Sequence, residues 1–94
     1  MEFGGRIPPH NLKAEQSVLG SMILDKDAIT DVTELIKEDD FYREAHRVIY
    51  DGIITLYDRN EPVDLVTLSA ELSKIGEFDS VRLLQQSWRP QVAP

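Results

Sequence analysis

The 94-residue sequence contains no cysteine, which excludes a disulfide framework, a thiolate metal site and a cysteine nucleophile. Its uninterrupted apolar runs, such as residues 22–24, are far shorter than the roughly 18 residues of a membrane span. Residues 1–6 do not resemble a secretory leader. We therefore expect a cytoplasmic protein that does not enter a membrane.

Basic residues are also scarce. Lys and Arg number 10 against 17 Asp and Glu, which gives a formal net charge of −7. Much of the imbalance lies in residues 25–40, where seven acidic residues accompany two lysines. Because nucleic-acid binding is driven by cations that release counterions from phosphates, a domain with this charge should repel a duplex. If the protein acts on DNA, we expect another part of it to bind the DNA.

The motifs of nucleotide and metal chemistry are missing as well. No G-x-x-x-x-G-K-[ST] loop is present, so we expect no nucleotide hydrolysis by this chain. Asp25 and Asp27 begin like a calcium loop, but Thr30 occupies the position of its obligatory glycine. His10 and His46 are 36 residues apart, without neighbouring ligands at metal-site spacing. The sequence predicts no catalytic residue, no bound cofactor and no metal site.

His46 leaves one enzymatic hypothesis open. It could act as a general base with Glu44 or Asp51, and a strongly shifted pKa on titration of the folded domain would be that hypothesis's main support. Beside Ala45 on an amphipathic segment, however, a histidine is more often partly buried and hydrogen-bonded. We favour this structural role.

The sequence does have strong helical periodicity. Apolar residues recur every three or four positions in four segments, at residues 12–24, 26–37, 43–59 and 65–75. Capping side chains precede three of them, namely Asn11, Asp25 and Asp64. Gly76 stands where a left-handed C-terminal cap belongs. Since the connections are short and no window alternates with a period of two, we predict an all-α fold, a small orthogonal or antiparallel bundle of at least four helices.

The periodicity also predicts the domain organisation. Residues 1–10 form an N-terminal arm that ends in two prolines, and residues 11–81 form a helical head. Beyond Val81 the helical period is lost, and residues 82–94 hold two prolines and an isolated Trp88. We expect these last residues to be a disordered tail.

One segment is a candidate partner interface. The acidic run Glu38, Asp39 and Asp40 is followed by Phe41 and Tyr42, directly before the strongest helical pattern. Phe41 is expected in the core, whereas Tyr42 is as well suited to the core as to an exposed anchor for a partner. The candidate interface residues are therefore Tyr42, Asp39, Asp40 and Glu38.

Several collinear segments resemble one protein family. Residues 6–22 read RIPPHNLKAEQSVLGSM, and they are followed by DFY at 40–42, AHRVIY at 45–50, EPVDLVTL at 61–68 and GEFDSV at 76–81. In this order they are similar to the opening of bacterial replicative DNA helicases of the DnaB family. The similarity stops at residue 82, where the family continues with two glycines and this chain reads RLLQQSWRP. A change of reading frame or an artificial extension would produce such a tail, and natural divergence is the alternative.

The resemblance implies a function. In the family, a helical N-terminal head joins a helical hairpin, a linker and a motor domain, and six chains form a ring around single-stranded DNA. The heads form a collar that stabilises the ring and recruits primase or a helicase loader. ATP and Mg²⁺ belong to the motor domain, which also contacts DNA, and this chain carries only the head. The resemblance thus implies a non-catalytic domain whose partners are other helicase subunits and primase or a helicase loader.

An alternative hypothesis, independent of the family, is that the chain is a free-standing helical adaptor or a small helix-turn-helix DNA-binding module. A shift of DNA mobility by this chain at low salt would favour the DNA-binding module. The charge of −7 argues against it.

Overall fold

The computed structural model describes residues 11–87, which are all-helical and contain no strand. The elements are α1 (Leu12–Leu24), α2 (Lys26–Leu35), the short 3-10 helix η1 (Glu38–Asp40), α3 (Glu44–Asp58), α4 (Leu65–Lys74) and α5 (Phe78–Ser87). This confirms the predicted all-α class. Among the described helices, none has the length and apolar character needed to cross a membrane.

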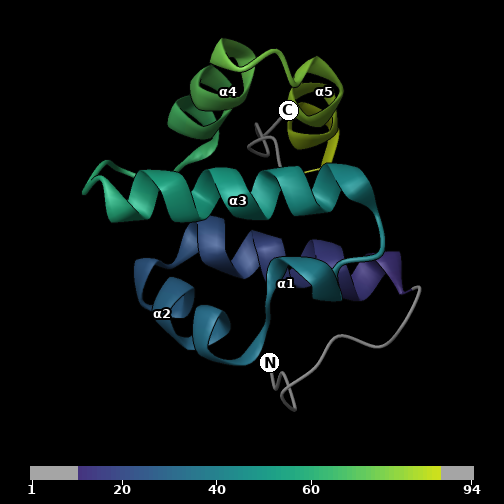
Figure 1. Cartoon of the computed structure of the whole chain (residues 1–94), viewed down its shortest axis with the longest axis vertical. Coiled ribbons are helices and arrows are strands. Elements are labelled where there is room, and N and C mark those ends of the chain that lie inside the picture. Colours follow the sequence, from purple (N-terminus) through teal and green to yellow (C-terminus); the bar gives the residue numbers. More distant parts are fainter. Residues whose placement is uncertain (1–10, 88–94) are drawn as a thin grey trace, which may run out of the picture.

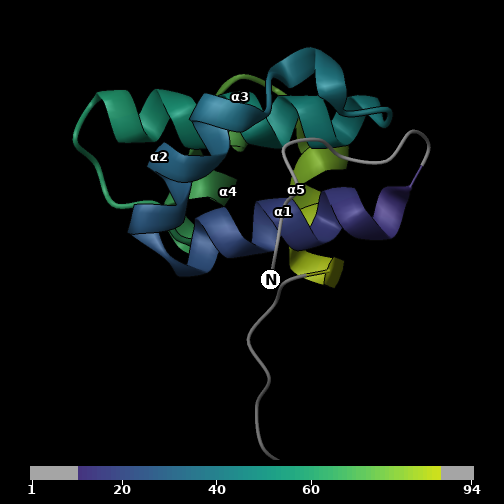
Figure 2. The ribbon, with the colours of Figure 1, turned by 90° about the horizontal axis from the view of Figure 1, so that it is seen from below.

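Helix α3 lies at the centre of the domain (Figure 1), with α1 and α2 on one side and α4 and α5 on the other. Seen from below, α1 lies beside α3 and runs in the same direction, and α4 and α5 lie behind them (Figure 2). This order places the N-terminal half of α1 next to the start of α3. The candidate interface segment enters α3 at that end.

The helix starts follow the predicted capping residues. The Oδ1 atom of Asn11 accepts a hydrogen bond from the Ala14 amide at 3.0 Å. Asp25 caps α2 in the same way, and the Oδ1 atom of Asp64 accepts from the Thr67 amide at 2.8 Å. These side chains satisfy amides that have no partner inside their own helix. After α4 the chain turns through Gly76 at φ +81°, as the sequence indicated.

The apolar stripe of α3 forms the middle of the core, as predicted. Ile49 and Ile53 are completely buried. Gly52 allows α4 to approach, because a Cβ atom at this position would lie 3.0 Å from Leu68 Cδ1 and 3.1 Å from Leu72 Cδ2. The absence of a side chain at residue 52 therefore sets how closely α3 and α4 pack.

The end of α2 differs from the prediction. The pattern placed Leu35 and Ile36 together on the apolar face of a helix ending near Lys37, but α2 ends at Leu35. Ile36 takes an extended conformation, with φ −126° and ψ 134°, and is fully buried, while Leu35 is 49% exposed. Because the chain leaves the helix at Ile36, the two residues no longer share a face.

The expectation of a tail after Val81 is wrong for residues 82–87. They belong to α5, and Leu84 is fully buried in the common core. Half-buried Val81 and Leu83 pack against that core beside it. So short a helix is stabilised by the surface on which it packs and not by a long periodic pattern of its own, which is why the periodicity did not predict it. Residues 88–94 of the expected tail, and the expected arm at 1–10, lie outside the described residues.

Candidate partner interface

Residues 38–43, here called the acidic segment, connect α2 to α3 and contain all four candidate interface residues. Glu38 and Asp39 are exposed, Asp40 is half-buried, and Tyr42 is 57% exposed. Phe41 between them is completely buried, which confirms its predicted core position. The segment therefore exposes the Tyr42 ring and several carboxylates on either side of the buried Phe41.

Hydrogen bonds hold the backbone on both sides of the buried Phe41. The Lys37 amide donates to Oδ2 of Asp40 at 2.8 Å, which closes the turn of η1. The Arg47 Nε–H donates to the Phe41 carbonyl at 2.7 Å, and the Tyr50 hydroxyl donates to the Ile36 carbonyl at 2.6 Å. Arg47 and Tyr50 belong to α3, so the segment is tied to the helix that follows it.

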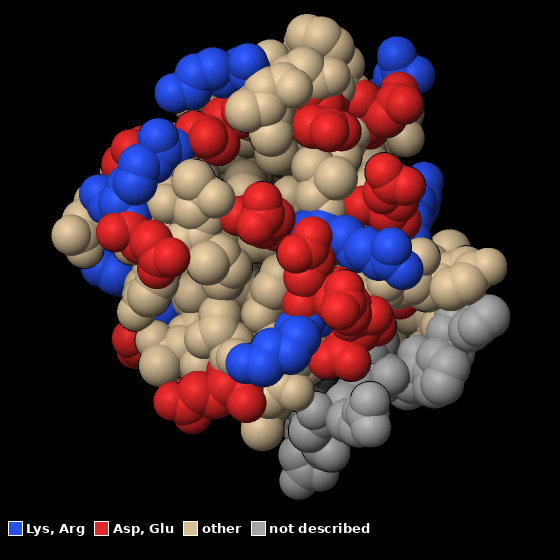
Figure 3. Space-filling model, viewed as in Figure 1, with Lys and Arg blue, Asp and Glu red and all other residues tan. Residues whose placement is uncertain are grey.

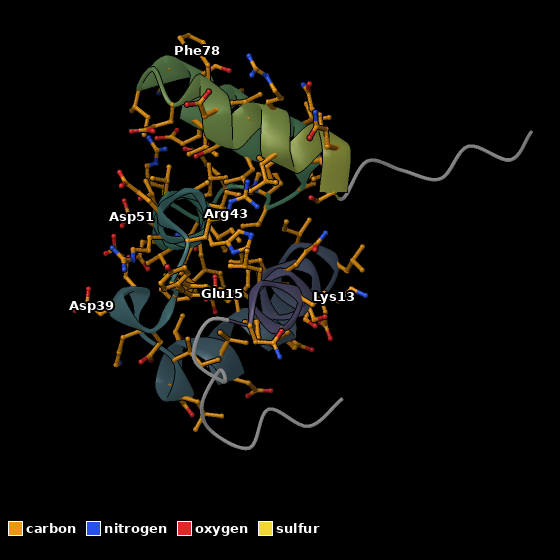
Figure 4. The ribbon with its side chains drawn as sticks, turned by 90° about the vertical axis from the view of Figure 1, so that its right-hand side faces the viewer. Lys13, Glu15, Asp39, Arg43, Asp51 and Phe78 are labelled. Carbon is orange, nitrogen blue, oxygen red and sulfur yellow. The ribbon has the colours of Figure 1, made fainter. Side chains whose placement is uncertain are left out.

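A buried carboxylate from α1 completes these attachments. Glu15 is completely buried, and Figure 4 shows it between α1 and α3. Its Oε2 accepts from the Tyr42 amide at 2.6 Å, and its Oε1 accepts from the Arg43 amide at 3.4 Å. Oε1 also lies 2.8 Å from Nδ1 of His46. An ionised carboxylate only accepts hydrogen bonds, so the tautomer of His46 that matches this contact is the one with a proton on Nδ1.

This arrangement compensates for the weak local capping of α3. The N-cap residue, Arg43, makes no capping hydrogen bond with its side chain, in contrast to the caps of α1, α2 and α4. The Glu15 carboxylate instead meets the backbone at the entrance to α3, where the helix dipole favours a negative charge. A residue 28 positions away in the sequence thereby acts on the start of this helix.

His46 has the buried, hydrogen-bonded role that we favoured. It is 2% exposed, whereas Glu44 and Asp51, the partners considered for acid–base chemistry, are both exposed. Its Nδ1 faces Glu15. A general base must reach the proton that it removes from a substrate, so this geometry does not support the acid–base enzyme hypothesis.

Glu15 was missed as a site residue by the sequence analysis. A signal was present, because Leu12, Glu15, Leu19 and Met22 follow the three- and four-residue spacing of one helix face. A carboxylate on an apolar stripe calls for buried donors, and the sequence does not show where those donors lie. Within residues 11–87, no group of three or more potential metal ligands comes together.

The surface around the acidic segment is negative. Figure 3 shows acidic side chains gathered over η1 and the adjoining part of α3, with basic side chains between them. This charge also acts on Tyr50. Burial raises the pKa of the Tyr50 hydroxyl above its ordinary value of 10.0, and the negative charges of Asp40 and Glu38 raise it further.

The Tyr50 hydroxyl should make the domain less stable in alkali. Above about pH 10 the hydroxyl ionises first in the unfolded chain, so its stabilising contribution is lost as the pH rises through the folded-state pKa. Tyr50→Phe should reduce this alkaline loss, and it should cost about 1–3 kcal/mol at neutral pH because the Ile36 carbonyl loses its donor. Urea unfolding at pH 7 and at several values above pH 10 measures both effects.

Tyr57→Phe is the matched control, because the Tyr57 hydroxyl pairs with Thr30 at an exposed position. It should keep the alkaline dependence of the native domain. If the stability of Tyr50→Phe fell with rising pH as steeply as that of the native domain, ionisation of the Tyr50 hydroxyl would not contribute to the alkaline loss.

Comparison with known proteins agrees with this fold. The model of the DnaB-like helicase N terminal domain family matches residues 7–87, six residues beyond the end predicted for the head. The crystal structure of the N-terminal domain of DnaB helicase from Mycobacterium tuberculosis superposes with a TM-score of 0.77 at 49% identity. That superposition covers 85% of this chain and 58% of the other.

Longer relatives are similar to most of this chain. The replicative DNA helicase DnaB of Mycobacterium leprae is 58% identical over 72 residues, which cover 77% of this chain and 12% of that protein. The replicative DNA helicase DnaB of Leifsonia xyli subsp. xyli is 51% identical over 73 residues, which cover 78% of this chain and 16% of that protein. The chain thus spans less than a fifth of the length of these relatives. It belongs to the DnaB-like helicase N-terminal domain family and is the N-terminal domain of a replicative DnaB-type helicase.

Proposed function

We propose that this domain is a non-catalytic interaction module that supports assembly of the helicase ring and contacts primase, or a helicase loader, through the acidic segment. The observation that carries the proposal is the combination of an exposed ring at Tyr42 with a backbone fixed on both sides of Phe41. In this proposal ATP, Mg²⁺ and DNA are bound by the motor domain of the whole protein. The process takes place in the cytoplasm.

The geometry of the acidic segment suits protein recognition. A surface that is already ordered loses little conformational entropy on binding, so more of the contact energy appears as affinity. Tyrosine is enriched among the residues that dominate interfaces, because its ring brings a large contact area at a small entropic cost. Tyr42 is the exposed aromatic residue of this segment. It is therefore the proposed anchor.

The charge of the segment indicates the chemistry of the partner surface. Glu38 and Asp39 are exposed, and Tyr42 follows them closely along the chain. Complementary charge speeds the encounter of two proteins and is screened by salt. The partner should therefore present basic residues near the pocket that receives Tyr42, and binding should weaken as the ionic strength rises.

Ring assembly adds avidity to a weak single contact. One domain of this size offers a limited patch, and small interfaces usually give transient complexes. Several copies held in one collar raise the effective concentration for a partner that can engage more than one of them. We therefore expect the isolated domain to bind primase weakly and a hairpin-containing, oligomeric version to bind it more tightly.

The proposal predicts a salt-sensitive interaction that depends on Tyr42. Labelled helicase-binding domain of primase is titrated with this domain and with a version extended through the hairpin, at two ionic strengths. Tyr42→Ala should weaken binding by about tenfold, which corresponds to about 1.4 kcal/mol, because it removes the anchor. The extended version should bind more tightly than the isolated domain.

Phe78→Ala is the matched control, since Phe78 is 62% exposed and lies away from Asp39 and Arg43 of the acidic segment (Figure 4). It should bind as the native domain does. Tight, salt-independent binding by both lengths, unchanged in Tyr42→Ala, would refute the role of the acidic segment. No binding by either length would leave ring assembly as the function of the domain.

A further inference from the structure

We infer that Glu15 is a positioning residue for the acidic segment, so that the orientation of the partner surface depends on a buried carboxylate supplied by α1. This inference rests on the proposed function. It adds a residue that lies outside the surface and has no access to the partner, because Glu15 is completely buried.

The inference begins with the origin of the contacts. The side chains that hold the Ile36 and Phe41 carbonyls, Tyr50 and Arg47, both come from α3, and the Lys37 bond to Asp40 lies within the turn itself. Glu15 comes from α1. It therefore fixes the segment relative to a second helix. The hydrogen bonds within the segment and those to α3 do not have this effect.

The Glu15 carboxylate acts on the residues at the surface. Its Oε2 bonds the amide of Tyr42 itself, at 2.6 Å, and Oε1 lies 3.4 Å from the amide of Arg43. These two amides belong to the peptide units on either side of the Tyr42 Cα, and the orientations of both units together set the direction of the Tyr42 side chain. A change at Glu15 therefore reaches Tyr42 through the peptide units on both sides of it.

His46 supports the carboxylate from the other side. Its Nδ1 lies 2.8 Å from Oε1 of Glu15, and its ring meets the buried Phe41 ring edge-on with centroids 6.5 Å apart. The imidazole thus contacts the Glu15 carboxylate on one side and the buried Phe41 ring on the other. Three donors from residues 42–46 converge on Glu15, which leaves its carboxylate little freedom to move.

The attachment of α1 to α3 does not itself need Glu15. Leu19 and Met22 of α1 are completely buried in the same core as Ile49 and Ile53 of α3. These apolar side chains continue to hold α1 in place when the charge of Glu15 is removed. The change in the folded structure on losing the carboxylate is therefore expected in the acidic segment, even though the free energy of unfolding of the whole domain also falls.

The test compares two variants that both weaken a buried site but differ in what they touch. Glu15→Gln keeps the size of the side chain and one acceptor oxygen, and it removes the charge and the second acceptor. Ile53→Val deletes one buried methyl group of α3, seven residues beyond His46, and contacts none of the three Glu15 donors through a hydrogen bond. Both are measured at a temperature and urea concentration at which the domain is fully folded.

Two readouts separate positioning from a general loss of stability. In Glu15→Gln, hydrogen exchange at the amides of Tyr42 and Arg43 should accelerate by about tenfold or more, and affinity for the primase helicase-binding domain should fall by about three- to tenfold. Ile53→Val should leave both the exchange rates of these amides and the affinity unchanged. Native affinity in Glu15→Gln would overturn the inference whether or not the two amides exchange faster, and so would native exchange at both amides.

A pair of variants at His46 gives a second test if Glu15→Gln does not fold. His46→Asn keeps a side-chain donor near the position of Nδ1, and His46→Ala removes it. The inference expects His46→Asn to bind primase more tightly than His46→Ala, and equal affinities would contradict it. Tyr42→Ala separates the two proposals. Native binding by Tyr42→Ala refutes the proposed surface. Weak binding by Tyr42→Ala together with native binding by Glu15→Gln refutes only the positioning role of Glu15.

Discussion

Replacing Leu84 by alanine should lower the free energy of unfolding by about 2–5 kcal/mol, the range for a large-to-small substitution in a packed core. Leu84 is completely buried, and α5 packs against both α3 and α4. The substitution removes apolar contacts and leaves a cavity that the neighbouring helices can fill only in part. Urea unfolding followed by circular dichroism measures the change.

Gln85→Ala is the control for the Leu84 experiment, because Gln85 is exposed in the same helix and surface substitutions usually stay within about 0.5 kcal/mol. Truncation after Val81 should destabilise the domain at least as strongly as Leu84→Ala, since it removes Leu84 together with more than half of α5. If Leu84→Ala changed stability by less than about 0.5 kcal/mol, α5 would not be docked, and the tail expected from the sequence would begin at residue 82 after all.

The features that the sequence predicted well are local. The stripe around Ile49 and Ile53 is long enough for its period to outweigh the β-branched residues within it. Asp64 caps α4 through a residue only three positions away, and Gly76 turns the chain directly after that helix. Such interactions depend on spacing along the chain, which the sequence displays directly.

The features that the sequence did not predict depend on distant residues. Leu84 becomes a core residue only because α3 and α4 provide a surface for it. Helix α5 is too short for its apolar spacing to predict a helix from the sequence alone. Glu15 meets donors 27 to 31 residues away, so its role follows from the packing of α1 on α3. The sequence analysis identified four candidate interface residues within one segment, but Glu15, the residue inferred to orient that segment, lies outside it on α1.

Removing the buried carboxylate should have the other large effect. Glu15→Ala takes away the acceptor shared by the amides of Tyr42 and Arg43 and by His46. Breaking a buried, charged hydrogen-bonded pair by deleting one partner typically costs about 3–5 kcal/mol, because the remaining polar groups are left in a dry environment. We expect a loss of this size in urea unfolding. Glu44→Ala, which removes an exposed carboxylate of the same type from the first turn of α3, should stay within about 0.5 kcal/mol.

A double-mutant cycle with His46→Ala tests whether the carboxylate and the imidazole act together. Since they lie 2.8 Å apart, each single substitution already removes their interaction, so the double variant should be less destabilised than the sum of the two single variants. The coupling should lie between about 0.5 and 3 kcal/mol. Strict additivity would mean that Glu15 stabilises the domain through the amides of Tyr42 and Arg43 alone. In that case His46 would lose its part in holding the acidic segment, and the backbone contacts of Glu15 would carry the whole link between α1 and the partner surface.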